Sequence, residues 1–411
     1  MSSTAQIQVD LMGHAHSTLR IAIVTETYPP DVNGVAHTLS KIVEGLIDRG
    51  HLIWLIHPSQ SSEALQDTSG RFKQVLVKGL PIPFYKQLRM GFPAKKELLR
   101  LWTQHRPDVV HIATEGPLGW SALQAGKKLK LPISSDFRTN FHAYSHHYGI
   151  GWLHGAIMSY LRKFHNTTNC TMVPTDRLKD ELNALGFKNL KVVPRGVDTQ
   201  HFNPNQRQIS LRERWNAKPE TVVMMCVGRL AAEKNLSQVV QTYQAAKSQS
   251  KDVRLVLVGD GPMRDALQAE NPDIIFSGFQ KGQDLAQHYA SADVFLFPSM
   301  TETFGNVTLE AMASGLTVVA YKHAAAGEII DSGHNGLIAP EGDATAFTQA
   351  ALMLLQAPLQ RESMAQQARA TAEAMAWQLI FQKTETVLHQ VIADCDLSYS
   401  KKIQTHALAS T

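Results

Sequence analysis

The chain has 411 residues, of which 44% are hydrophobic and 18% are charged. This length exceeds one ordinary domain and suits two domains of about 150–200 residues, each large enough to bury a core. The net charge of +4 is too weakly basic to indicate a nucleic-acid-binding protein. Three widely separated cysteines without a Cys-x-x-Cys pair argue against a disulfide framework and a cysteine zinc site, and they fit a reducing compartment.

The first residues differ in character from the rest of the chain. Residues 1–18 lack the apolar core of a signal peptide, so we expect a flexible leader there. No window approaches about 18 consecutive apolar residues, so no transmembrane helix is expected. The sequence therefore predicts a cytoplasmic protein and leaves open its contact with a membrane surface.

Short apolar runs alternate with helical patterns from residue 19 onward. Runs rich in Val, Ile and Leu are typical of parallel strands buried on both faces, and a loop and an amphipathic helix follow each of them. In the first half, the expected strands are residues 19–25, 52–57, 108–112, 132–137, 171–174 and 191–194. The expected helices are residues 37–48, 94–104, 119–130, 151–166 and 176–185.

Residues 194–204 interrupt this pattern with residues that oppose helix formation, and they predict an inter-domain hinge. The second half repeats the pattern, with expected strands at 222–228, 253–259, 274–278, 293–298 and 316–320. We therefore predict an α/β protein with two Rossmann-like, doubly wound parallel-sheet domains facing a cleft. The predicted units are the domains 19–195 and 196–376, a helix from 377 to 395 that crosses back, and a tail from 396 to 411.

Loops after the strands of the second domain carry candidate binding groups, because ligands of open α/β sheets bind beyond the carboxyl ends of the strands. Arg229 follows the first of these strands, and Lys234 opens the next helix, where free N–H groups and the helix dipole favour anions. The pair predicts a phosphate or diphosphate site, with two solvated surface charges as the alternative. Gly259 and Gly261 follow the next strand and allow a close backbone approach or a bare turn.

The segment Thr301–Gly315 holds two glutamates with seven residues between them, Glu302 and Glu310. Asn306 is predicted to cap a short helix over residues 307–314, which leaves Glu302 in the preceding loop and Glu310 just past the first turn. Ionised carboxylates only accept hydrogen bonds, which suits the hydroxyl groups of ribose or a hexose. The alternative is that both glutamates are ordinary surface side chains.

The loop after the first strand of the chain is a candidate for the opposite wall of the cleft. Gly34 would let its backbone approach a ligand closely. Glu26 and Asp31 are either cleft carboxylates or solvated ones. The loop does not contain G-x-G-x-x-G, so a hydride-transfer cofactor is poorly supported.

Four segments, in their order and spacing, resemble the retaining nucleotide-sugar glycosyltransferases of family 4, which have the GT-B fold. They are ETYPPDVNGV, VGRLAAEKN, VGDGP and ETFGNVTLEAMASG, and the resemblance spans about residues 19–390. The last segment matches the family's signature of two glutamates separated by seven residues. The first half is similar to the branch of diacylglycerol glycosyltransferases and sulfolipid synthases.

The resemblance implies a role for each matching residue. Arg229 and Lys234 would bind the diphosphate and stabilise the leaving nucleoside diphosphate, and Glu302 would hold hydroxyls of the donor sugar. Glu310 would bind the ribose. The other donor-binding positions would be Gly34, Gly259, Gly278, Phe279, Phe304, Gly305, Asn306 and Val307. No metal or other cofactor is expected, because the cations and the helix terminus would supply the positive field.

The acceptor side departs from the family's pattern. Members often carry a His-Thr pair in the loop after the fourth strand, where this chain has Arg138. Arg138 could contact an acidic donor sugar, an acceptor phosphate or only Asp136, and His111 is a second candidate to face the cleft. His142 and His146 would share a helical face. No third ligand type is evident, so surface or acceptor-loop histidines are favoured over a zinc site.

Residues 71–100 form the one charge-biased segment, with eight Lys or Arg side chains against one acid, Glu97. Cations among exposed apolar side chains suit an anionic membrane surface, and an ordinary loop with an amphipathic helix is the alternative. No RNA- or DNA-binding motif accompanies the segment, so a nucleic-acid partner is not expected.

Together these features predict a retaining hexosyltransferase at the cytoplasmic face of a membrane. It would use a nucleotide sugar, by preference a UDP-sugar, and a membrane lipid such as diacylglycerol. An alternative is a mannosyl- or glucosyltransferase acting on a polysaccharide, lipopolysaccharide or phosphoinositide-type acceptor. A non-enzymatic alternative is a nucleotide-sugar-binding scaffold on a degenerate GT-B frame, against which the retained cations and glutamates argue. The oligomeric state is not predicted.

Overall fold

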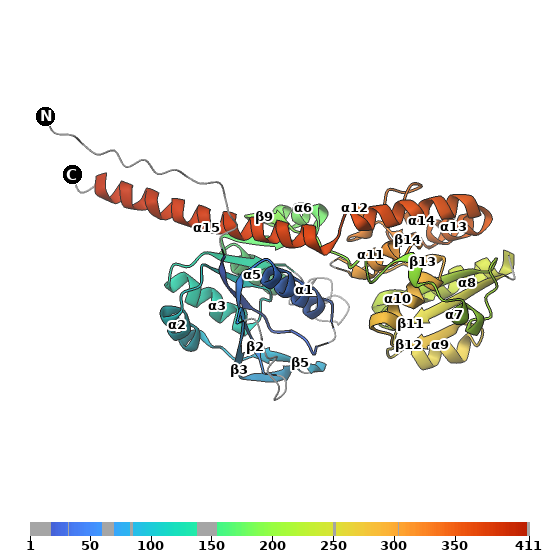
Figure 1. The fold of residues 1–411 in the computed structure, drawn as a ribbon, viewed down its shortest axis with the longest axis horizontal. Helices are drawn as coiled ribbons and strands as arrows, with labels where there is room; N and C mark the ends of the chain where they lie inside the picture. Colours follow the sequence, from blue (N-terminus) through green and yellow to red (C-terminus); the bar gives the residue numbers. More distant parts are fainter. Residues whose placement is uncertain are drawn as a thin grey trace.

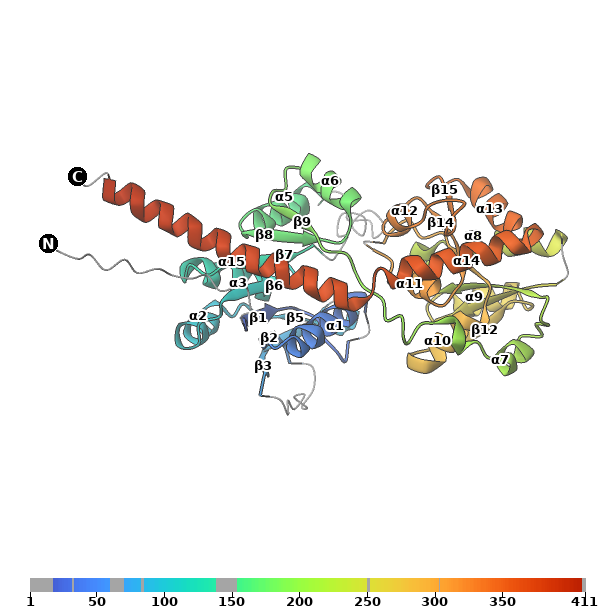
Figure 2. The ribbon, with the colours of Figure 1, turned by 45° about the horizontal axis from the view of Figure 1, so that its top comes forward.

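A computed structural model describes residues 18–31, 33–59, 70–82, 85–137, 154–249, 252–302 and 304–408 of the chain. Two α/β halves lie next to each other, and a long C-terminal helix, α15, extends from the second half along the first (Figure 1). A tilted view shows this helix crossing the whole first half (Figure 2). The predicted leader lies outside the described residues, except for its last residue.

The first half is built on a seven-stranded parallel sheet with the order β3-β2-β1-β6-β7-β8-β9. Its strands are β1 (Arg20–Val24), β2 (Leu52–Pro58), β3 (Phe72–Val77), β6 (Val109–Ile112), β7 (Ile133–Asp136), β8 (Cys170–Val173) and β9 (Leu190–Val192). Its helices are α1 (Gly34–Asp48), α2 (Lys95–Gln104), α3 (Pro117–Lys128), α5 (His154–His165) and α6 (Asp176–Ala184). Every residue of β6, β7 and β8 is buried, including the polar residues Ser134, Ser135 and Asp136 of β7.

The second half is built on a six-stranded parallel sheet with the order β12-β11-β10-β13-β14-β15. Its strands are β10 (Val222–Val227), β11 (Val253–Val258), β12 (Ile275–Gly278), β13 (Val294–Phe297), β14 (Thr317–Tyr321) and β15 (Leu337–Ala339). Its helices are η2 (Pro204–Gln206), α7 (Ile209–Arg214), η3 (Ala232–Lys234), α8 (Leu236–Gln249), α9 (Arg264–Glu270), α10 (Gly282–Ser291), α11 (Asn306–Ala313), α12 (Ala326–Ile329), α13 (Ala344–Gln356) and α14 (Pro358–Glu373).

The central strand β10 shows why the strands of the second half have continuous apolar sequences. Val223 and Met225 belong to one buried apolar cluster, whereas Met224 and Cys226 belong to a second. Successive side chains of a strand point to opposite faces of the sheet, so helices cover both faces and neither face of β10 meets water.

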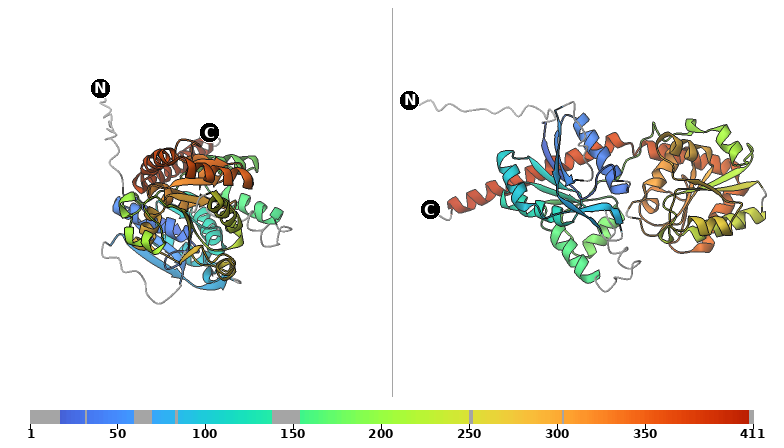
Figure 3. Two further views of the ribbon diagram at one scale, coloured as in Figure 1. Left: turned by 90° about the vertical axis from the view of Figure 1, so that its right-hand side faces the viewer. Right: turned by 90° about the horizontal axis from the view of Figure 1, so that it is seen from below.

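Both sheets reverse their strand order at one place, between β1 and β6 in the first half and between β10 and β13 in the second. Loops at the carboxyl ends of strands beside such a switch point form the ligand crevice of doubly wound sheets. Seen from below, the two halves are distinct bodies that lie side by side (Figure 3). The predicted architecture of two doubly wound parallel sheets is confirmed.

The segment 71–100 differs from the expectation, which placed no strand there. After β3, an antiparallel hairpin of β4 (Gly79–Ile82) and β5 (Tyr85–Gly91) precedes α2. Apolar side chains alternate with Lys and Arg in this segment, and half-exposed strands of this composition are easily taken for a charged loop.

Helix α15 spans Trp377–Leu408, so it starts where predicted but continues through most of the predicted tail. The expected end near 395 is therefore wrong: residues 396–408 contain neither Gly nor Pro to stop the helix. Its first half is held on the N-terminal sheet domain by the buried Glu385, which pairs with Arg49 and lies 3.0 Å from His51 Nε2.

Candidate active site

The turns after β10 and β11 pack backbone against backbone. Gly259 has a φ of 137°, and a Cβ atom on it would lie 1.9 Å from the carbonyl oxygen of Gly228. A Cβ atom on Gly261 would lie 2.4 Å from the carbonyl oxygen of Leu230. The glycines therefore hold the loop that carries Arg229 against the next loop, which agrees with the close approach predicted for them.

Lys234 and Glu302 meet between the loops after β10 and β13. The Lys234 ammonium forms an ion pair with the Glu302 carboxylate, and both side chains are largely buried. Ser299 Oγ donates a further hydrogen bond of 3.3 Å to the same carboxylate oxygen. The structure thus brings together two predicted site residues that are 68 positions apart in the sequence.

Arg229 lies on the same loop as Lys234 but is turned toward solvent. Its side chain is 52% exposed, and its guanidinium lies 3.7 Å from the carboxylate of Glu233 on the same turn. A long, exposed cation at the rim of the crevice is free to reorient toward an anionic ligand.

Helix α11 starts differently from the prediction. The N-cap residue is Gly305, with a φ of 87°, and Asn306 is the first helical residue and makes no capping bond. The predicted Asn306 cap is wrong because the chain enters the helix through a left-handed conformation, which favours glycine. The Asn306 amide instead reaches across to the other half, 3.5 Å from Thr38 Oγ1.

Glu310 lies one turn into α11. Its carboxylate accepts a hydrogen bond of 3.0 Å from the hydroxyl of the buried Tyr289. Burial raises the pKa of Glu310 to about 7, and the hydrogen bond from Tyr289 only partly offsets this rise. The environment of Glu310, the residue predicted to bind the ribose, therefore favours its neutral carboxyl form more than water does.

The opposite wall consists of the start of α1 and the hinge residue Arg195. Gly34 is the first residue of α1, which Asn33 caps by accepting a hydrogen bond of 2.8 Å from the Ala36 amide. Arg195 is buried and donates to Thr38 Oγ1 at 2.7 Å and to the Gly34 carbonyl at 3.4 Å.

The Arg195 guanidinium also faces the other half of the protein, 5.9 Å from the centre of the Phe304 ring. Sequence reasoning did not single out Arg195 or Thr38. The sequence places Arg195 only in the predicted hinge. Its position between Pro194 and Gly196 is the feature from which its role in the crevice wall could be inferred.

Of the residues predicted for the acceptor side, the structure describes His111 but not Arg138. His111 is buried, and its ring nitrogens lie 2.9 Å from Ser134 Oγ and 3.1 Å from Asp136 Oδ2. It lines a small pocket together with Thr38 and Arg195. Arg138, His142 and His146 lie outside the described residues. Asp136 is therefore occupied by His111 in the part of the chain that the structure describes.

Glu26 is not a cleft carboxylate. Its carboxylate accepts hydrogen bonds from the backbone amides of Gly91 and Leu118, at 2.5 Å and 3.0 Å. It therefore ties the end of β5 to the first turn of α3. Burial raises its pKa, which the backbone hydrogen bonds partly offset.

The predicted base-binding segment lies at the end of β12. Gly278 has a φ of 68°, and Phe279 beside it is 58% exposed. The guanidinium of Arg264, paired with Asp260 at 3.3 Å, lies over Gly278. An exposed aromatic ring next to a glycine offers a flat surface on which a base can stack.

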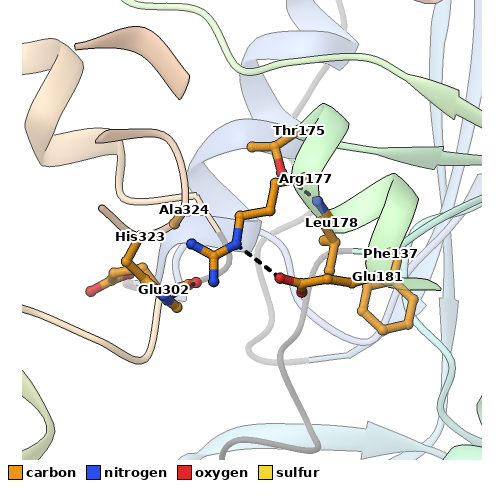
Figure 4. A pocket seen from close by; sticks show the side chains of 8 residues that line it. All are labelled: Phe137, Thr175, Arg177, Leu178, Glu181, Glu302, His323 and Ala324. Carbon is orange, nitrogen blue, oxygen red and sulfur yellow. Dashed lines mark hydrogen bonds and ion pairs between the residues drawn. The ribbon is translucent and has the colours of Figure 1, made fainter. Parts of the chain in front are cut away.

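A second pocket opens between the two halves beside Glu302 (Figure 4). It is lined by Phe137, Thr175, Arg177, Leu178 and Glu181 from the first half and by Glu302, His323 and Ala324 from the second. Carboxylates, a guanidinium and an aromatic face in one pocket suit a polyhydroxylated ligand, because hydroxyl groups both donate and accept hydrogen bonds.

Comparison with known proteins identifies the family. Residues 32–201 match the family model described as Glycosyltransferase Family 4, and residues 221–357 match the one described as Glycosyl transferases group 1. The chain is 35% identical to a GDP-mannose-dependent alpha-mannosyltransferase of Mycobacterium tuberculosis, over 79% of this chain and 85% of that protein. The chain belongs to glycosyltransferase family 4.

The glycosyltransferase is also 28% identical to the sulfoquinovosyl transferase SQD2 of Arabidopsis thaliana, over 87% of this chain and 71% of that protein. It is 27% identical to an alpha-monoglucosyldiacylglycerol synthase of Streptococcus pneumoniae, over 74% of this chain and 71% of that protein. Its fold is similar to that of a sucrose-phosphate synthase from Thermosynechococcus elongatus, with a TM-score of 0.73 and 18% identity over 91% and 99% of the two chains. The predicted GT-B fold and the predicted hexosyltransferase are confirmed.

The described residues of the glycosyltransferase bear on membrane insertion and on metal binding. Across those residues, no helix combines the length and apolar character needed to span a bilayer. In the same part of the chain, no group of three or more His, Cys, Asp or Glu side chains is placed to hold a metal ion.

Proposed function

We propose that this glycosyltransferase moves a hexose, with retention of anomeric configuration, from a nucleotide sugar to a lipid acceptor at an anionic membrane surface. The observation that carries the proposal is the meeting of Lys234, Glu302 and the first turn of α11 at the β10–β13 switch point. A cation, a carboxylate and helix amides at this place match the phosphate and the hydroxyl groups of a sugar diphosphate.

The donor would lie along the second half of the protein. Arg229 and Lys234 bind the diphosphate, Glu302 binds hydroxyls of the hexose, and Glu310 binds the ribose. The base stacks near Gly278 and Phe279, and the turn at Gly259 and the backbone of residues 304–307 border the phosphates and the sugar. Gly34 approaches from the other half, and no metal is needed because the two cations and the start of α11 supply the positive field.

The reaction exchanges one bond for another at the anomeric carbon. The bond to the diphosphate oxygen breaks, a bond to the acceptor oxygen forms, and the acceptor proton leaves with the diphosphate. Lys234 stabilises the negative charge that develops on the leaving oxygen. Closure of the two halves excludes water, so that the acceptor hydroxyl and not water reaches the sugar.

Two donor nucleotides are candidates. The sequence favours a UDP-sugar, whereas the mannosyltransferase of Mycobacterium tuberculosis, at 35% identity, is named for GDP-mannose. The exposed, flat base site at Phe279 suits either base. We therefore propose a UDP-hexose as the first donor to test and GDP-mannose as the second.

The proposal of a lipid acceptor is based on the surface of the first half. Leu80 and Met90 are directly opposite each other in the hairpin, and both are exposed, as is Phe92. Phe92 donates its amide to the carbonyl of Lys78, so these four side chains lie on one face by strand alternation. Apolar side chains flanked by cations favour insertion at an anionic membrane, and the synthase of Streptococcus pneumoniae is named for a diacylglycerol product.

A transfer assay tests the proposal. Purified protein is incubated with UDP-glucose, UDP-galactose, GDP-mannose or ADP-glucose and with vesicles that contain diacylglycerol or phosphatidylinositol, and the lipids are analysed by mass spectrometry. We expect a hexosylated lipid with one donor and about 100-fold less of it, or lower still, with Lys234→Ala. Transfer only to a water-soluble glycan, or nucleotide binding without transfer to any acceptor, would overturn the proposal.

A further inference from the structure

The start of α6 in the first half is bound by a carboxylate of the second half. The backbone amides of Asp176 and Arg177 donate to the two oxygens of Glu328, at 3.0 Å and 2.7 Å. Glu328 belongs to α12, about 150 residues further along the chain. The first amides of a helix have no partner inside it and carry the positive end of its dipole, so an outside carboxylate binds them well.

The side chain of Arg177 makes a second connection between the halves. Its Nη1 donates to the carbonyl of Lys322 at 2.7 Å, and its Nη2 lies 3.4 Å from Glu341 Oε2. Its Nε is held by Glu181 of the same helix, at 2.9 Å. One residue therefore connects α6 to three sites of the second half, through its backbone and its guanidinium.

These contacts lead to the predicted sugar-binding glutamate. Glu341 Oε2 also lies 3.4 Å from His323 Nδ1, and His323 Nε2 lies 3.2 Å from the carbonyl oxygen of Glu302. Arg177, His323 and Glu302 all line the pocket between the halves (Figure 4). Glu341 therefore lies beside both Arg177 and His323, although its 3.4 Å approach to His323 Nδ1 is a close contact and not a hydrogen bond. His323 Nε2 in turn contacts the backbone of Glu302.

We propose that Arg177 and Glu328 form an inter-domain clasp that holds the closed arrangement of the two halves and positions Glu302 for the donor sugar. Arg177 is a positioning residue here, because it acts on Glu302 through His323 and Glu341. The part of the inference that concerns the donor sugar rests on the proposed function. When the halves separate, the two amides and the guanidinium lose their partners in the second half together, so closure is cooperative across this one helix end.

The clasp is tested with Arg177→Ala and Glu328→Gln, and Lys179→Ala serves as the matched control. Lys179 is a second cation of α6 and lies 3.8 Å from Asp176 of the same helix. The distance between the halves is measured by fluorescence energy transfer, with and without UDP or GDP. We expect both clasp variants to populate the closed distance about tenfold less than the wild-type protein, because each loses charge-assisted hydrogen bonds, and the control to be unchanged.

Binding and turnover separate positioning from a structural role. Because all the proposed nucleotide contacts except that of Gly34 lie in the second half, UDP or GDP affinity should stay within about twofold of the wild-type value, while kcat/KM for the acceptor falls about tenfold. Arg177→Lys should restore little of the closed population or of kcat/KM, because a lysine ammonium cannot contact the Lys322 carbonyl and Glu341 at the same time.

Unchanged inter-domain distances and kinetics in Arg177→Ala, or a loss of nucleotide affinity equal to its loss of turnover, would overturn the clasp. Glu328→Gln keeps the inference testable if Arg177→Ala does not fold. The distance measurement requires no acceptor, so a protein that closes through Arg177 but glycosylates no lipid would count against the proposed function and not against the clasp.

Discussion

Lys234 and Glu302 neutralise each other in the crevice. Each side chain is largely buried and holds the other in place, so the cation is fixed at the position where we propose that the diphosphate binds. Preorganised charges of this kind lower the barrier more than mobile ones, because they cost no reorganisation during the reaction. At the residue scale, the site therefore depends on one ion pair and on the charge state of Glu310.

Replacing Lys234 with alanine is expected to lower kcat by about 100-fold or more, because the charge that develops on the leaving diphosphate loses its partner. Steady-state kinetics of hexose transfer measure the effect. Lys247→Ala is the control, since Lys247 forms an exposed ion pair with Asp273 outside the crevice. A kcat of Lys234→Ala within twofold of the control would contradict the assigned role.

The pKa of Glu310, which burial raises to about 7, predicts a pH dependence of nucleotide binding. The carboxylate form accepts hydrogen bonds from both ribose hydroxyls and is lost as the pH falls through 7. We expect the contribution of Glu310 to UDP or GDP affinity to fall about tenfold between pH 8 and pH 6. Titration calorimetry at several pH values measures this change.

Glu310→Gln provides the reference for that titration, because the nucleotide phosphate also binds protons near pH 6. The amide does not titrate, so the profile of the variant contains only the contribution of the nucleotide. Identical pH profiles for the variant and the wild-type protein would show that Glu310 does not contact the ribose.

At the scale of elements, the crevice is formed by turns that admit no side chain. Gly259 illustrates this, because its amide donates to the Gly278 carbonyl at 2.8 Å while its Cα faces the Gly228 carbonyl. Gly259 therefore contacts both the end of β12 and the turn after β10, and it fixes the distance between them. The positions of the loops that carry Arg229 and Phe279 both depend on this packing of Gly259.

Gly259→Ala is expected to destabilise the protein by more than about 3 kcal/mol, because the new methyl group overlaps backbone that cannot move aside. Gly282→Ala is the matched control. Gly282 also has a positive φ, 51°, but no atom lies within 4 Å of its added Cβ atom, so it should cost only about 1–2 kcal/mol. Chemical denaturation measures both, and equal losses would contradict the packing argument.

At the scale of the whole molecule, the first half carries the hairpin face of Lys78, Leu80, Met90 and Phe92. It belongs to the same body as α1 and the Arg195 wall of the crevice. An enzyme bound through this face would keep the donor half on the other side of the crevice. The lipid acceptor would then have to enter from the first half.

The double variant Leu80→Ser and Phe92→Ser is expected to lower affinity for phosphatidylglycerol-containing vesicles by about tenfold or more, because two apolar side chains no longer insert. Vesicle sedimentation at moderate salt measures binding. Leu359→Ser is the control, since Leu359 is 81% exposed but lies on α14 of the second half. Equal binding of the double variant and the control would show that the hairpin does not contact the membrane. Vesicle binding by the wild-type protein that does not change at high salt would argue against a role for the cations.

The sequence alone determined the family and the central strands of the two sheets, because parallel strands buried on both faces form regularly spaced apolar runs. It did not predict the edge strands β3 and β15. It also found Lys234, Glu302 and Glu310, since their positions after strands follow from topology. Only the tertiary structure paired Lys234 with Glu302, replaced Asn306 by Gly305 as the cap, and took Glu26 out of the cleft. It also found Arg195 and the Arg177–Glu328 clasp, because these contacts join residues far apart in the chain, and no local pattern of side chains encodes which distant partner each one meets.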